Sequence, residues 1–120
     1  MATEDKCCSI VPYFQVNEGE LANFKSLCEE FVAKSSTEEG CIYYGFAFNG
    51  NQVHCREGYK NGEGVLAHLD NVGELIGRAL EISELLRMEI HGPEEELQKL
   101  REPLTELNPQ YFVLECGFRK

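Results

Sequence analysis

Two neighbouring segments in the middle of the chain alternate between two sets of residues, as the strands of a β-hairpin do. They flank Asn49-Gly50, a pair that tolerates the positive φ angles of a tight turn. One set of alternating positions consists of Ile42, Tyr44, Phe46 and Phe48 before the turn and Val53, Cys55, Glu57 and Tyr59 after it. The other set of the first segment is also apolar or small, so we expect both faces of this strand to be covered.

Apolar residues at spacings of three and four predict a helix from Asn17 to about Ser35. Asn17 is the expected N-cap, and Glu18 and Glu20 fall in the first turn, where the helix dipole favours negative charge. The apolar stripe consists of Leu21, Phe24, Leu27, Cys28, Phe31 and Val32. Such a stripe is typical of a helix that packs one face against a sheet.

The remaining predicted elements are shorter. We expect a strand over 9–16, short helices over 65–72 and 75–80, a strand over 85–91, a helix over 93–101 and a final strand over 111–118. Gly73 separates the two short helices, and Pro93 begins the third. Pro12 cannot donate a backbone hydrogen bond, so we expect it at a sheet edge or a bulge.

The predicted order β-α-β-β-α-α-β-α-β reduces to β-α-β-β-α-β when the additional helices are removed. This is the α+β, ferredoxin-like arrangement, an antiparallel sheet with helices on one face. We expect one domain over 1–120, with a flexible start over 1–8 and an additional helix and strand over 93–120. The second sheet face is apolar enough to predict a homodimer whose sheets pack together, with a cavity between sheet and helices in each subunit.

Composition narrows the classes of partner. The net charge of -10, from 21 acidic and 11 basic residues, argues against binding to nucleic acid or to an anionic membrane surface. No apolar run reaches the ~18 residues that span a bilayer, and the start does not resemble a signal peptide, so we expect a cytoplasmic protein. In that compartment the six cysteines are expected to be free thiols rather than three disulfides.

Three short segments together resemble the antibiotic biosynthesis monooxygenase superfamily. The segment 39–44, Glu-Gly-Cys-Ile-Tyr-Tyr, is similar to the Pro-Gly-Cys entry of that family's second strand. The segment 56–59, Arg-Glu-Gly-Tyr, is similar to its Glu-x-Trp strand ending, and 67–69, Ala-His-Leu, to its helical His-Leu. The resemblance covers about residues 9–92, and the tail over 93–120 is longer than the minimal family domain.

The resemblance implies a dimeric α+β barrel, in which a C-terminal strand reaches across to the partner. It also implies an oxygenase reaction without a metal, flavin or haem cofactor, in which an electron-rich phenol or quinol is deprotonated and reacts with dioxygen. The residues that carry over are Glu57, Tyr59 and His68. The chain has no tryptophan, so it lacks the Asn, Trp and His combination of haem-degrading members.

His68 and Glu57 are the candidate catalytic residues. His68 shares a helix face with Val65 and Val72, so it points inward, where a neutral imidazole accepts a phenolic proton. The alternative is a core histidine that is hydrogen-bonded to the sheet. Glu57 shares a strand face with Val53, and burial there raises the pKa of a carboxyl group. The alternative for Glu57 is an ion pair with Arg56, Arg87 or Arg119, or an exposed position at the sheet margin.

Three tyrosines, Tyr43, Tyr59 and Tyr111, are candidates for substrate binding, because each supplies a ring surface and a hydroxyl group. Tyr44 is a further candidate of the same kind. We expect no metal site, since His54 and Cys55 point to opposite faces of a strand and no third ligand converges with them. The sequence thus predicts a small apolar or aromatic ligand and leaves open whether the protein turns it over or only binds it.

Overall fold

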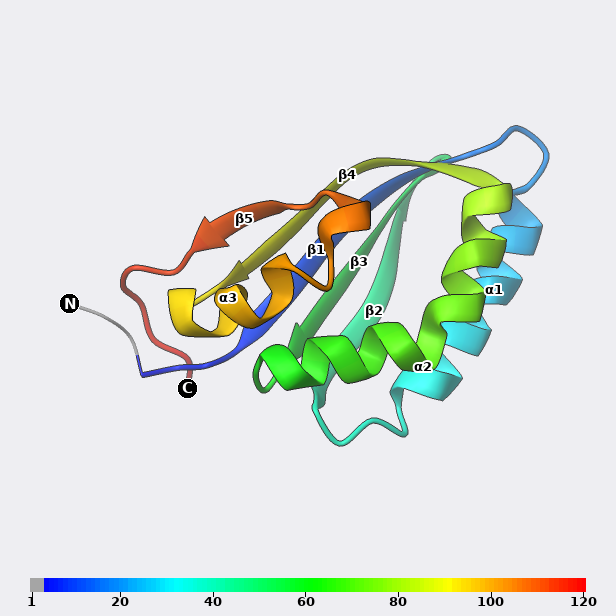
Figure 1. Ribbon diagram of the computed structural model, residues 1–120. Helices are drawn as coiled ribbons and strands as arrows, with labels where there is room; N and C mark the ends of the chain where they lie inside the picture. Colours follow the sequence, from blue (N-terminus) through cyan, green and yellow to red (C-terminus); the bar gives the residue numbers. More distant parts are fainter. Residues whose placement is uncertain (1–3) are drawn as a thin grey trace.

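Five strands form one open, mixed sheet in the order β2-β3-β1-β4-β5, as the computed structural model of residues 4–120 shows (Figure 1). The strands are β1 (Cys8–Val16), β2 (Cys41–Asn49), β3 (Gln52–Tyr59), β4 (Ser83–Gly92) and β5 (Gln110–Val113). The strands β1 to β4 pair with one another in antiparallel fashion, whereas β5 runs parallel to β4. The predicted α+β, ferredoxin-like fold is therefore confirmed for β1 to β4. The prediction of a wholly antiparallel sheet is wrong, because β5 joins the β4 edge in parallel.

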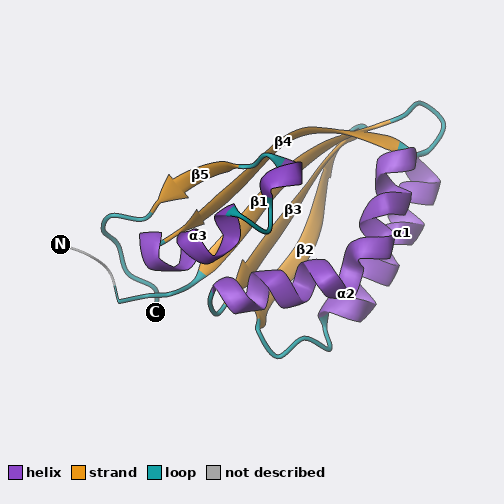
Figure 2. Cartoon of the chain, in the orientation of Figure 1, coloured by secondary structure: helices purple, strands orange, loops and turns teal. Residues whose placement is uncertain are grey.

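The helices lie together on one face of this sheet (Figure 2). They are α1 (Leu21–Ser35), α2 (Gly62–Glu81), α3 (Glu94–Arg101) and the short 3-10 helix η1 (Thr105–Leu107). α1 and α2 pack over one end of the sheet around Phe24, Val53 and Leu75. α3 packs over the other end through Leu97 and Leu100. Within residues 4–120, the opposite sheet face carries no helix. None of the helices of residues 4–120 is long and apolar enough to cross a membrane.

The hairpin forms in the register that the alternation predicts. Tyr44 pairs with Glu57, Phe46 with Cys55 and Phe48 with Val53, and Gly50 in the turn has a φ of 59°. Because side chains on a strand alternate between the two faces, this register places Cys55, Glu57 and Tyr59 on the helix-covered face.

Pro12 lies in the middle of the sheet, because β1 is flanked by β3 and β4. The sheet accommodates it beside an irregularity in which the pairing of β1 with β4 shifts between Tyr13 and Phe14. Pro12 itself stays in register with Met88, and the shift follows it directly along β1. Of the two predicted settings, the structure therefore shows the bulge and not the edge.

Two predicted helix boundaries are wrong. The stretch 65–80 forms one helix, α2, because an apolar face at helical spacing continues across Gly73 and its packing outweighs the low helix propensity of glycine. α1 begins at Leu21, not after Asn17. Residues 17–20 instead form a turn in which Gly19 has a φ of 83° and the Glu20 N–H donates to the Asn17 carbonyl.

The predicted final strand and the predicted flexible start are both longer than the structure shows. β5 covers four residues, and residues 114–120 continue without regular structure. Of the expected flexible start, residues 1–3 lie outside the described residues, whereas Cys8 is buried in β1. Asp5 forms an ion pair with Arg119, so the two ends of the described chain lie together (Figure 1).

Candidate active site

A cavity lies between the helix-covered face of the sheet and the two long helices. Its volume is about 60 Å³, and since a buried water needs ~10–15 Å³, it has room for more than a single water molecule. Most of the lining is apolar: Ile10, Pro12 and Phe14 from β1, Tyr44 and Phe46 from β2, Cys55 from β3, Leu85 and Met88 from β4, Phe24 and Phe31 from α1, Leu69, Ile76, Ala79 and Leu80 from α2, and Leu107 from η1. The lining also contains a carboxyl group and an imidazole, those of Glu57 and His68.

Local structure fixes both of these residues. Glu57 follows Val53 and Cys55 at period two along β3, which directs its side chain toward the helices. His68 lies on the buried face of α2 together with Val65 and Val72. The start of α2 is fixed by Asn61, whose side chain accepts a hydrogen bond from the Gly64 N–H at 2.9 Å.

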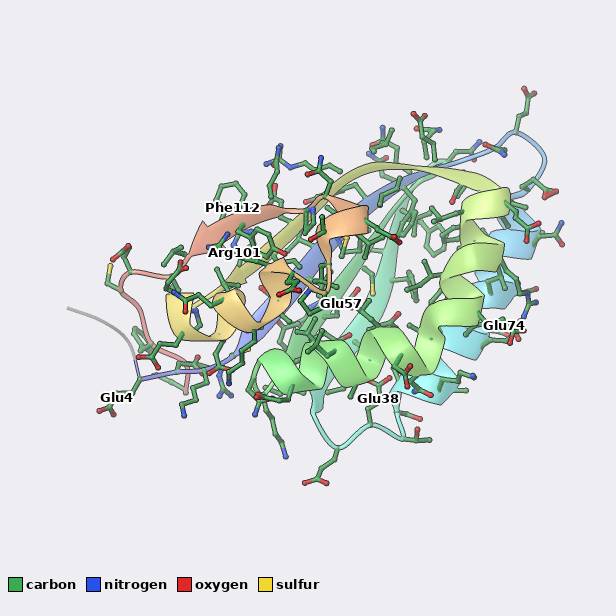
Figure 3. All side chains as sticks on the ribbon, viewed as in Figure 1. Glu4, Glu38, Glu57, Glu74, Arg101 and Phe112 are labelled. Carbon is green, nitrogen blue, oxygen red and sulfur yellow. The ribbon has the colours of Figure 1, made fainter. Side chains whose placement is uncertain are left out.

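The structure brings His68, Glu57 and Tyr59 together. His68 Nε2 lies 3.5 Å from Glu57 Oε1, and the Tyr59 hydroxyl donates a hydrogen bond of 2.7 Å to the same oxygen. Glu57 and His68 are 5% and 2% exposed, respectively, so water screens their interaction little. Figure 3 shows Glu57 in the space between the sheet and α2.

Glu38 completes this polar cluster from the loop between α1 and β2. Both of its carboxylate oxygens lie 3.0 Å from His68 Nδ1. Its Oε2 atom also accepts a hydrogen bond of 2.8 Å from the Asn71 side chain on α2. Glu38 lies where the loop meets α2 (Figure 3). His68 is therefore held between two carboxyl groups, one at each ring nitrogen.

Burial controls the ionisation of the pair. Burial raises the pKa of Glu57 to about 7, against the opposing effect of the hydrogen bond from Tyr59. Burial lowers the pKa of His68, and the neighbouring Glu38 carboxylate opposes that shift. A carboxyl group with a raised pKa and an imidazole with a lowered pKa both favour the neutral state. Near neutral pH, Glu57 is thus partly protonated and His68 is mostly neutral.

The four tyrosines named from the sequence occupy different places. Tyr44 lines the cavity, and its ring centroid is 5.2 Å from that of His68. Tyr59 is fully buried behind Glu57 and does not line the cavity. Tyr43 lies on the opposite sheet face beneath Arg56, and Tyr111 packs beside α3 with its hydroxyl on the Leu100 carbonyl. The structure does not bring Tyr43 or Tyr111 to the cavity.

The arginines named as alternative partners of Glu57 are engaged elsewhere. Arg56 stacks over the Tyr43 ring, Arg87 pairs with Glu89 on the other sheet face, and Arg119 pairs with Asp5. His68 is buried and contacts Glu57 of the sheet, as expected of a core histidine, and it also lines the cavity. Glu57 is therefore neither paired with an arginine nor exposed at the sheet margin.

Sequence reasoning missed Glu38 and Asn71 as parts of the site. Glu38 lies in the polar loop Ser-Ser-Thr-Glu-Glu-Gly over 35–40, where no periodicity distinguishes it from Glu39. Asn71 follows His68 by three residues on α2, a spacing that places both on one side of a helix. That spacing is the sequence signal that could have identified Asn71 as a neighbour of His68.

Among residues 4–120, no three or more His, Cys, Asp or Glu side chains are grouped so that they could hold a metal ion. The six cysteines, all within this range, are free thiols, and burial raises the pKa of the Cys8 and Cys28 thiols to about 12.

Solved structures similar to this chain include a near relative and more distant ones, although no protein-family model and no curated protein matched it. The near relative is MupZ from Pseudomonas fluorescens, which is 46% identical over 100% of this chain and 94% of MupZ, with a TM-score of 0.94.

The more distant structures share the fold. A "Putative antibiotic biosynthesis monooxygenase" from Nitrosomonas europaea is 14% identical over 78% of this chain and 96% of its own, with a TM-score of 0.68. A protein of unknown function from Bacteroides thetaiotaomicron, described as "Possible Oxidoreductase", is 23% identical over 72% of this chain and 96% of its own, with a TM-score of 0.66. The chain belongs to one family with MupZ, and this family has the fold of the antibiotic biosynthesis monooxygenase superfamily.

Proposed function

We propose that this protein is an acid–base enzyme that acts on a small aromatic or quinol-type compound in the manner of a cofactor-independent monooxygenase. The observation that carries the proposal is the buried Glu57–His68 pair in the wall of an otherwise apolar cavity. Buried ionisable pairs with shifted pKa values are costly for stability and are concentrated at catalytic sites. The family and the fold are consistent with this chemistry, and the substrate is inferred from the cavity lining.

In the proposed reaction, His68 takes the proton of a phenol or enol. Glu38 occupies Nδ1, so the free electron pair of neutral His68 is on Nε2, toward the cavity and Glu57. The resulting phenolate or enolate gives electrons to dioxygen and forms a carbon–oxygen bond. For a CH2 group next to the ring, the balance is CH2 plus O2 to C=O plus H2O, and the proton that His68 took returns to the departing oxygen.

A proton-transfer reaction without dioxygen is the second candidate. It is favoured by the raised pKa of Glu57, about 7, which keeps a proton donor in the cavity near neutral pH. In such a reaction Glu57 donates a proton to a substrate oxygen while His68 accepts one from another atom. Isomerisation and ring opening or closure are reactions of this class.

Oxygen uptake with hydroquinones and anthrone-like phenols tests the proposal. We expect uptake by the wild type, and a fall of about 10²–10⁴-fold in His68→Ala and in Glu57→Gln. Glu74→Gln is the matched control, since it makes the same change at an exposed position of α2. Uptake that is unchanged in both site variants contradicts the assignment of the site.

The same panel separates the other readings. Product formed under nitrogen, with no oxygen consumed, identifies the second candidate. Binding without any product identifies a non-catalytic small-molecule-binding protein.

We also propose that the protein is a homodimer joined through the open sheet face. That face carries exposed apolar side chains at Tyr13, Leu86 and Phe112, which are 40%, 47% and 43% exposed. A second copy of the sheet would remove them from water. Light scattering at micromolar concentration is the test, and a monomeric mass contradicts the proposal.

A further inference from the structure

We infer that Glu38 is a positioning residue, which fixes the hydrogen of His68 on Nδ1 and thereby keeps Nε2 free to exchange a proton with Glu57 and the substrate. The inference rests on the proposed function for its catalytic meaning. Its structural content, the tautomer of His68, is independent of any activity.

The loop holds Glu38 firmly in place. Its backbone N–H donates to the Ser35 carbonyl at 3.1 Å, and its own carbonyl accepts from the Cys41 N–H at 3.4 Å. Its side chain is 8% exposed. The Glu38 carboxylate therefore sits in a fixed position beside α2 and does not sample solvent freely.

Asn71 connects this carboxylate to both long helices. Its side-chain nitrogen donates to Glu38 Oε2 at 2.8 Å and to the Lys34 carbonyl at the end of α1 at 3.1 Å. The Lys34 ammonium in turn donates to the Asn71 carbonyl at 3.3 Å. The Glu38 oxygens thus face two donors, His68 Nδ1 and the Asn71 amide.

An ionised carboxylate only accepts hydrogen bonds, which decides the tautomer of the ring. With both Glu38 oxygens 3.0 Å from Nδ1, the hydrogen of neutral His68 must be on that nitrogen. Nε2 is then an acceptor, and it faces Glu57 Oε1 at 3.5 Å. If the hydrogen moved to Nε2, the Nδ1 electron pair would point at the Glu38 carboxylate. Nε2 could then no longer accept a proton from Glu57 or the substrate.

The remaining groups around His68 do not compete for this role. The ionisable side chains that face the ring are Glu38 from the loop, Glu57 and Tyr59 from β3, and Tyr44 from β2. Burial raises the pKa of both tyrosines far above neutral pH, so they stay uncharged donors. Within the described part of the chain, Glu38 is the group that contacts Nδ1.

Nitrogen-15 NMR of labelled imidazole rings tests the inference directly. At about pH 6.5, where His68 with its lowered pKa is mostly neutral and Glu57 with its pKa of about 7 mostly keeps its proton, we expect the wild-type His68 ring to show a protonated Nδ1 and an unprotonated Nε2. In Glu38→Gln, an amide nitrogen faces either His68 or Asn71, so we expect the preference for Nδ1 to be lost. Glu39→Gln, the exposed neighbour, is the matched control and is expected to keep the wild-type tautomer. A hydrogen on Nε2 in the wild type overturns the inference, and that measurement needs no variant.

Kinetics then show whether the tautomer matters for turnover. We expect Glu38→Gln to lower kcat about 10- to 100-fold with a smaller change in KM, as is typical of residues that orient a catalytic group. Glu38→Asp, which keeps the charge, should recover part of this loss. An unchanged kcat in a variant whose tautomer has shifted overturns the positioning role. A wild type without turnover on any compound contradicts the proposed function but leaves the NMR result standing.

Discussion

The two faces of the sheet each carry a glutamate and a histidine in contact, and the two pairs behave in opposite ways. On the helix-covered face, Glu57 lies 3.5 Å from His68 in an apolar cavity, and burial raises the pKa of Glu57 to about 7. On the open face, Glu89 lies 2.7 Å from His91, and the hydrogen bond from His91 holds the pKa of Glu89 below its usual range, with help from Arg87.

The contrast shows that the surroundings of a Glu–His pair, and not the pair itself, decide its chemistry. Glu89 pairs with the Arg87 guanidinium and is partly exposed. Its carboxylate is therefore stabilised and is a weak base at neutral pH. Glu57 has no arginine or lysine partner among residues 4–120 and is almost fully buried. Near neutral pH, the Glu57 carboxyl group on the inner face therefore still carries a proton in part of the molecules. The Glu89 carboxyl group on the outer face is ionised.

The largest expected effect is on turnover, and it should be confined to the inner pair. We expect Glu57→Gln to lower kcat by about 10²–10⁴-fold, since the variant has no carboxyl group to exchange a proton. Glu89→Gln removes the same charge on the other face and should retain the wild-type rate. Comparable losses in both variants would remove the distinction between the two faces.

The second largest expected effect is on the free energy of unfolding, because side chains on the two faces are packed differently. Phe24 is 1% exposed beneath the sheet, and we expect Phe24→Ala to cost about 3–5 kcal/mol in the free energy of unfolding, because it leaves a cavity. Phe112 on the open face is 43% exposed, and Phe112→Ala should cost about 1 kcal/mol or less in the monomer. Urea unfolding measured by circular dichroism gives both values. A large loss for Phe112→Ala that grows with protein concentration would place Phe112 in a dimer interface.

The inner face was largely predictable from the sequence because its pattern is periodic. Alternation along β3 placed Glu57 inward, and the helical spacing of Val65, His68 and Val72 placed the histidine opposite it. Glu38 was not predictable, since a loop has no period and its contact with His68 joins residues 30 positions apart. Tyr43 was named for its ring and hydroxyl group, and because both faces of β2 are apolar, the pattern does not say which face the helices cover.

The C-terminal part was harder to predict for a different reason. The strand signal after Pro109 was correct, but its place in the sheet depends on how α3 and η1 turn the chain. That turn brings β5 parallel to β4, puts Tyr111 against α3 and puts Leu107 into the cavity wall. These are contacts between distant segments, which local patterns do not encode.

The smallest expected effect is on the pH dependence of stability, where the two glutamates should differ in sign. Unfolded Glu57 ionises above about pH 4.5, whereas the folded carboxyl group stays protonated up to about pH 7. As the pH rises through this window, the wild type should lose up to about 3 kcal/mol of unfolding free energy relative to Glu57→Gln. For Glu89 the lowered pKa has the opposite consequence: its contribution is present at neutral pH and is lost as the pH falls through the titration of the carboxyl group.

Urea unfolding at several values from about pH 3 to about pH 8 measures both differences against the wild type, since Glu89 titrates below its ordinary pKa of 4.5. We expect the advantage of Glu57→Gln over the wild type to grow with pH, and the disadvantage of Glu89→Gln to shrink toward the acid end. With the glutamine oxygen of Glu57→Gln at the place of Glu57 Oε1, it still accepts from the Tyr59 hydroxyl, so the variant removes the charge and keeps this hydrogen bond. A difference for Glu57→Gln that does not change with pH would mean that Glu57 ionises as an exposed carboxyl group does, and the inner pair would then hold no proton at neutral pH.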